Sequence, residues 1–113
     1  MDSCSSQADD ESFAPLSSPD ARVRLTFLRD LCPCHVKRHV PAIWDRILPL
    51  VCDPDPKVRS TALHILADGS PRERAEEIAW AIGTMVNDPD LKLRRRVRRV
   101  LSAYRRTASV NTL

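Results

Sequence analysis

The residues with the clearest capacity for chemistry form a cluster of bases near the end of the chain. Positions 91–113 hold eight Lys and Arg and no acidic side chain. Guanidinium groups donate paired hydrogen bonds to carboxylates and phosphates, so the cluster favours binding to an acidic partner. The competing interpretation is a solvated cationic face that complements the negative end of its own helix. We expect partner binding through the following residues: Lys92, Arg95, Arg96, Arg98, Arg99, Arg105 and Arg106.

A helix must gather these side chains. Apolar residues recur at helical spacing from about residue 90 to residue 106, which predicts an amphipathic helix. In that helix Arg95, Arg98 and Arg99 share one face, and Arg106 extends it. No aromatic residue alternates with the arginines, which disfavours stacking on single-stranded nucleic acid. An acidic protein surface is therefore the first expectation, and the backbone of a nucleic-acid duplex is the second.

Trp80 is a further candidate contact. Its neighbours at helical spacing include Glu76, Gly83 and Thr84, which make a polar face around the indole. An exposed Trp beside a small residue favours an anchor for a partner or for a second subunit. Packing against a neighbouring helix is the equal alternative.

Thiols and imidazoles form another cluster, at Cys32, Cys34, His35 and His39. Two thiolates and two imidazoles can complete a tetrahedral zinc site. The gap between the two cysteines is one residue, however, instead of the usual two. Pro33 also suits a turn that ends a helix without any metal. We therefore expect no metal and no cofactor.

Motifs for catalysis are missing from the sequence. It has no glycine-rich loop for phosphates, no G-x-S-x-G nucleophile elbow and no H-E-x-x-H motif of zinc proteases. We therefore expect a protein that is not an enzyme.

Composition indicates one small all-α domain in a reducing compartment. The chain has 113 residues, 42% of them hydrophobic and 29% charged, with two glycines. Without a signal-like segment or an apolar run of membrane-spanning length, a cytoplasmic location and no membrane contact are expected. The four cysteines are then reduced thiols.

Charge is distributed unevenly along the chain, although the net charge is only +3. Residues 1–20 carry five acids and no base, and residues 21–90 are balanced. We expect residues 1–17 to form a disordered acidic tail, residues 18–106 a helical domain and residues 107–113 a short C-terminal tail. The acidic tail is read mainly as solubilising, with masking of the basic helix as the alternative.

One motif occurs three times at intervals of 35 residues. Its copies begin at Ser18, Asp53 and Asp88, and each is followed by Pro, Asp and an amphipathic run. A fixed period in this range is typical of helical repeats. Asp20, Asp55 and Ser70 suit helix N-caps, with Pro71 as the first helical residue after Ser70 and Glu73 completing a capping box. Together with helices over about 40–52 and 71–86, this predicts five helices, with Pro49 distorting the second.

The two clearest copies resemble the HEAT repeat, as found in small bacterial-type HEAT-repeat domain proteins. Residues 48–59 match closely, and residues 87–94 are a second match. The resemblance implies a short α-solenoid of about two and a half helical hairpins, whose second helices line a concave surface. It also implies a structural ladder between neighbouring repeats that uses Asp53, Arg59, Asp88 and Arg94, with Arg24 as a further member.

The expected function is a non-enzymatic interaction or scaffold module that binds an acidic partner through the basic face of its last helix. Binding of a duplex backbone through the same arginines is the first alternative. The second is a structural unit that forms a homo-oligomer through Trp80 or an uncapped end.

Overall fold

The computed structural model describes residues 11–31, 41–68 and 70–111, which are helical without any strand in these ranges. This confirms the all-α class with five α-helices. The α-helices are α2 (Ala21–Asp30), α3 (Pro41–Ile47), α4 (Pro56–Leu66), α5 (Ala75–Gly83) and α6 (Leu91–Thr107). Three 3-10 helices accompany them: η1 (Glu11–Ser17), η2 (Leu48–Cys52) and η3 (Arg72–Arg74). Among the described helices, none combines the length and the apolar character that crossing a membrane requires.

Two of the three predicted N-caps, Asp20 and Asp55, are confirmed. The predicted cap at Ser70 is wrong, because Pro71 stands at the N-cap of η3 without a side-chain hydrogen bond and the Ser70 hydroxyl donates to Asn111 Oδ1 at 3.2 Å instead. Asp90 is a further N-cap. Asp20, Asp55 and Asp90 have extended backbone angles, and each accepts a hydrogen bond from the first turn of its helix. The accepting oxygens lie 2.9 Å from Arg22 N, 2.7 Å from Lys57 N and 3.0 Å from Leu93 N respectively. Each cap satisfies an amide that the helix itself leaves unpaired.

Pro49 distorts the second predicted helix, as expected. The α-helix α3 ends at Ile47 and continues as the 3-10 helix η2. A proline has no N–H to donate to the carbonyl four residues before it, so regular α-helical hydrogen bonding stops there. The predicted helix over 71–86 is shorter than expected, because η3 precedes α5 and a turn follows Gly83.

The described parts of both predicted tails, residues 11–17 and 107–111, differ from expectation. Residues 11–17, which the sequence assigned to the disordered tail, form η1 against α2, and Leu16 is buried. At the other end, Ala108 turns the chain with a φ of 60° and Val110 is fully buried. Asn111 accepts a hydrogen bond from the Ser70 amide at 2.9 Å. Apolar burial therefore orders segments that have no helical periodicity of their own.

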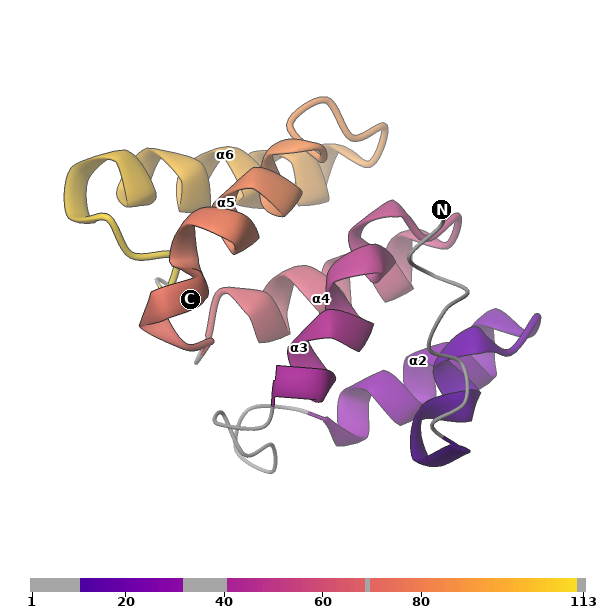
Figure 1. The fold of residues 1–113 in the computed structure, drawn as a ribbon. Helices are drawn as coiled ribbons and strands as arrows, with labels where there is room; N and C mark the ends of the chain where they lie inside the picture. Colours follow the sequence, from indigo (N-terminus) through magenta and orange to yellow (C-terminus); the bar gives the residue numbers. More distant parts are fainter. Residues whose placement is uncertain (1–10, 32–40, 69, 112–113) are drawn as a thin grey trace.

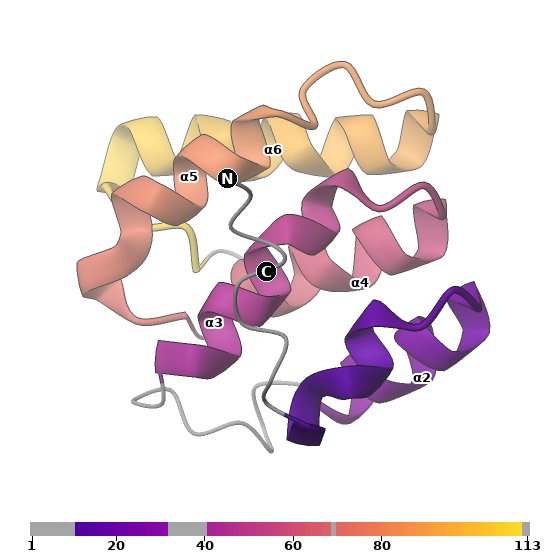
Figure 2. The same cartoon turned by 45° about the vertical axis from the view of Figure 1, so that its right-hand side comes forward.

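The helices form two layers. In both views of the ribbon, α2, α4 and α6 lie side by side in one layer, while η1, α3 with η2, and α5 form the other (Figures 1 and 2). Consecutive elements thus pair as η1 with α2, η2 with α4, and α5 with α6. The core between the layers includes these fully buried residues: Trp44, Ile47, Leu63, Leu66, Ile78, Ile82, Val97 and Val100.

Candidate functional site

Two ion pairs with the same geometry hold α2, α4 and α6 together. The Nε and Nη2 of Arg24 donate to Asp53 at 2.7 and 3.0 Å, and those of Arg59 donate to Asp88 at 2.8 and 3.0 Å. In each arginine Nη1 donates to a carbonyl six residues earlier, on Ser18 and Asp53. We call each arginine with its carboxylate a rung. The rungs fix the register of neighbouring helices in this layer.

Both rungs are buried, and hydrogen bonding keeps the Arg59–Asp88 rung charged against the effect of that burial. In both pairs the arginine side chain is 12% exposed and the aspartate side chain 4% exposed. Burial alone raises the pKa of the Asp88 carboxyl, but hydrogen bonds from Arg59 and from the Asp90 amide outweigh burial and lower it. The hydrogen bond to Asp88 raises the pKa of Arg59 against the opposing effect of burial. Short, paired hydrogen bonds of this kind are among the strongest in proteins.

The two layers differ in charge. Helices α2, α4 and α6 contain thirteen Lys and Arg and one acidic residue, Asp30. The elements of the opposite layer (η1, α3, η2, η3 and α5) contain three Lys and Arg and five acids. Clustered charge of one sign creates a potential that attracts the opposite sign. The predicted basic cluster on α6 is therefore part of a larger surface.

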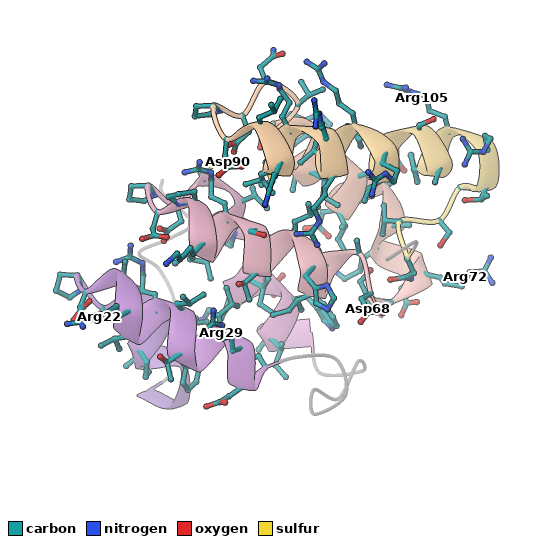
Figure 3. The ribbon with its side chains drawn as sticks, turned by 180° about the vertical axis from the view of Figure 1, so that it is seen from behind. Arg22, Arg29, Asp68, Arg72, Asp90 and Arg105 are labelled. Carbon is teal, nitrogen blue, oxygen red and sulfur yellow. The ribbon has the colours of Figure 1, made fainter. Side chains whose placement is uncertain are left out.

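Bases recur at equivalent positions of all three helices. The 35-residue spacing aligns two sets, which we call the basic columns: Arg22, Lys57 and Lys92, and Arg29, His64 and Arg99. All six residues are exposed. Positions seven apart share one side of a helix, so each helix carries one member of each column on the same side. We call the side of this layer that points away from the other layer the outward face. Seen from behind, Arg22 and Arg29 lie on α2 within this layer (Figure 3).

A polar depression lies at the centre of the outward face. Its volume is about 320 Å³, and Arg29, Ser60, Thr61, His64, Ile65 and Arg96 line it, so all three helices contribute. Arg96 Nη1 donates to Ser60 Oγ at 3.0 Å, which holds the guanidinium in place. His64 Nε2 lies 3.7 Å from Asp68, which is not among the lining residues. Guanidinium, imidazole N–H and hydroxyl groups all donate hydrogen bonds, so the depression suits an oxyanion.

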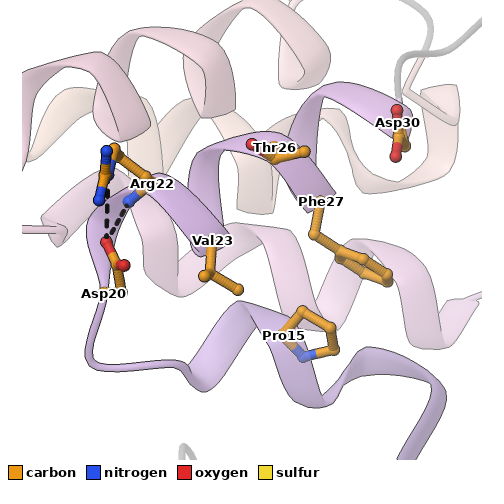
Figure 4. Close-up of a pocket in the computed structure, with 7 residues that line it drawn as sticks. All are labelled: Pro15, Asp20, Arg22, Val23, Thr26, Phe27 and Asp30. Atoms are coloured by element: carbon orange, nitrogen blue, oxygen red, sulfur yellow. Dashed lines mark hydrogen bonds and ion pairs between the residues drawn. The ribbon is translucent and has the colours of Figure 1, made fainter.

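A larger hollow of about 530 Å³ lies between η1 and α2 (Figure 4). Pro15, Val23 and Phe27 give it an apolar floor. Its one base, Arg22, lies 3.9 Å from the Asp20 carboxylate. It therefore lacks the converging donors of the polar depression.

The structure divides the predicted partner-binding residues into groups. Arg96 lines the depression, whereas Arg98 donates to Val86 O at 3.0 Å and to Asn87 Oδ1 at 3.1 Å. Arg98 is thus held against the turn between α5 and α6, apart from its predicted companions. Arg105 lies on the edge of α6 away from α4 (Figure 3). The remaining exposed members are Lys92, Arg95, Arg99 and Arg106, and Trp80 on α5 is 78% exposed.

Sequence reasoning missed Arg29 and His64. Neither belongs to a dense basic segment, but the 35-residue period that links them to Arg99 is a signal that identifies both. The metal candidates Cys32, Cys34, His35 and His39 lie outside the described residues. Within the described ranges, no group of three His, Cys, Asp or Glu is arranged to hold a metal ion.

Comparison of the chain with protein-family models, curated proteins and solved structures gave no match. The candidate site therefore rests on three features of the structure: two rungs that align three helices, two basic columns and one polar depression.

Proposed function

We propose that this protein is a non-enzymatic interaction module that binds an acidic polypeptide on the outward face of α2, α4 and α6. The observation that carries the proposal is the concentration of thirteen bases on one layer, around a depression that contains Arg29, His64 and Arg96. The proposed architecture is a short α-solenoid of the HEAT type, supported by the 35-residue period and the two equivalent rungs.

The depression suits a carboxylate side chain. The guanidinium groups of Arg29 and Arg96 donate to carboxylate oxygens, and Ser60 and Thr61 bring hydroxyl groups. Ile65 offers an apolar contact for the methylene groups of a glutamate. Because Ser60 already holds Arg96, less side-chain entropy is lost on binding. The basic columns around the depression speed the approach of an acidic chain.

A matched pair of charge reversals tests the location of the binding surface. Arg99→Glu changes an exposed base on α6, and Arg72→Glu changes an exposed base in η3 on the opposite layer. Both lower the net charge by the same amount. We expect Arg99→Glu to weaken binding of a labelled oligoglutamate roughly tenfold, about 1.4 kcal/mol, as measured by fluorescence anisotropy. Arg72→Glu should change the affinity much less, and equal losses would contradict the proposal.

The second candidate function is binding to the backbone of a nucleic-acid duplex. The observation that favours it is the column of Arg22, Lys57 and Lys92, which presents a row of cations across three helices to regularly spaced phosphates. A short DNA duplex that displaces bound oligoglutamate at lower concentration than an unlabelled acidic peptide does would favour this candidate. The salt concentration must be fixed at about 150 mM in both titrations, because both complexes weaken with salt.

A further inference from the structure

The series of rungs is incomplete at its C-terminal end. Arg24 and Arg59 each bind a carbonyl six residues earlier and a carboxylate 29 residues later. Arg94 repeats the first half of this arrangement, because its Nη1 donates to Asp88 O at 3.0 Å. Among the described residues, the Nε and Nη2 of Arg94 have no carboxylate acceptor within ion-pair distance.

This guanidinium is already positioned for a carboxylate. The Asp88 carbonyl fixes one nitrogen of Arg94, as the Asp53 carbonyl fixes the same nitrogen of Arg59. The two remaining N–H groups correspond to the pair that Arg59 uses to bind Asp88. A planar fork that is held in place loses little freedom when it forms a paired hydrogen bond with a carboxylate.

We propose that Arg94 is the binding site for an aspartate carboxylate of a second protein, which docks on the end of the α5–α6 pair. The two complete rungs show the chemistry of the missing group. In both, the aspartate also accepts its own chain's amide two residues later, at 2.9 Å. The partner therefore presents an aspartate in a similar turn, ahead of a helix.

Trp80 extends this docking surface. The residue 35 positions before it, Asp45, accepts a hydrogen bond from Arg74 at 2.6 Å and so reaches from α3 to the following helical pair. Trp80 is equivalent to Asp45, and Arg94 is equivalent to Arg59. Trp80 and Arg94 therefore both face the place that a further helical pair would occupy, and Trp80 is 78% exposed. Trp and Arg are the residues that most often dominate the binding energy of an interface.

The charge of this end favours an acidic partner. Leu63 and Ser70 are buried, whereas the residues 35 positions after them, Arg98 and Arg105, are exposed. Together with Arg94 they give the end surface three guanidinium groups. A partner surface with aspartate and other acids complements them, whereas an apolar surface leaves Arg98 and Arg105 desolvated.

A second copy of this chain is a poorer occupant than another protein. In the repeat register, the residue of a second copy that meets Arg94 is Ser18, which carries a hydroxyl where Asp53 and Asp88 carry carboxylates. A hydroxyl cannot accept both N–H groups in the paired geometry of a carboxylate, and it brings no negative charge.

NMR of arginine Nε–H groups in the full chain tests the proposal. The probe is a peptide with the sequence of residues 87–90, blocked at both ends, and its control has asparagine in place of the aspartate equivalent to Asp88. We expect the first peptide to shift the Arg94 Nε–H signal saturably, and the control to bind about fivefold more weakly, because it lacks the charge-assisted pair. Arg94→Lys should remove the difference between the peptides, followed in all variants at the Trp80 indole N–H, while Arg105→Lys and Arg99→Glu should preserve it.

Equal binding of the two peptides would overturn the proposal. So would an Arg105→Lys variant that loses the affinity difference between the peptides to the same extent as Arg94→Lys. Sedimentation at increasing protein concentration tests the identity of the occupant. We expect a monomer throughout. A dimer that Arg94→Lys abolishes would place a second copy on this surface and overturn the assignment to a different protein.

Discussion

Removing the charge of one rung should destabilise this protein far more than removing an exposed ion pair. Asp88 accepts three hydrogen bonds, at 2.8 and 3.0 Å from Arg59 and at 2.9 Å from the Asp90 amide. Its side chain is 4% exposed, so water cannot replace these donors. The change Asp88→Asn keeps the shape of the side chain but leaves the Arg59 charge without its counterion.

The magnitude follows from burial. Breaking a buried ion pair by altering one partner costs about 3–5 kcal/mol, and we expect about 3 kcal/mol because asparagine retains one acceptor oxygen. Domains of this size unfold with a total free energy of about 5–15 kcal/mol, so the loss is a large fraction. The matched control is Asp45→Asn. Asp45 pairs with Arg74 at 2.6 Å but is 61% exposed, and exposed pairs contribute about 0.2–1 kcal/mol.

Urea unfolding followed by far-ultraviolet circular dichroism measures both variants. The free energy of unfolding is compared at unchanged dependence on urea, because a changed slope reports a changed denatured or native state. A loss for Asp88→Asn that stays below about 1 kcal/mol, or that equals the loss for Asp45→Asn, would refute the inference that the rungs are buried structural ion pairs.

Two further predictions concern pH and the C-terminal segment. Because the folded pKa of Asp88 is lowered, its ionised form stabilises the fold above the unfolded pKa of about 3.9, and this contribution disappears as the pH falls through the folded value. Acid titration of stability should therefore be steeper below about pH 4 for the unmodified protein than for Asp88→Asn, and parallel curves would contradict this. Val110→Ala, at a fully buried position, should cost roughly 1–3 kcal/mol in the same urea assay, whereas a change below about 0.5 kcal/mol would show that the segment is not packed.

Local features of this protein were predictable from sequence. The predicted N-caps Asp20 and Asp55 act within one helical turn, and Pro49 acts on the hydrogen bond of its own segment. The basic cluster of α6 lies within one helix. Such signals need no knowledge of which segments meet in space.

Features that depend on tertiary contacts were not predictable in the same way. The burial of Leu16 and Val110 depends on apolar surface supplied by other elements. The polar depression unites residues from three helices, and Arg98 leaves its predicted companions because carbonyl and amide acceptors lie at the preceding turn. Only the 35-residue period carried information of this longer range, through positions such as Arg29, His64 and Arg99.

Chemical-shift mapping of the full chain with oligoglutamate tests the proposed function most directly. If the outward face of α2, α4 and α6 binds acidic polypeptides, the largest shifts should occur at the residues that line the depression, including Ser60, Thr61, His64 and the guanidinium groups of Arg29 and Arg96. They should saturate with a single affinity at about 150 mM salt. Shifts confined to α3 and α5, or no saturable shift on α4 and α6, would contradict the assignment of the binding surface.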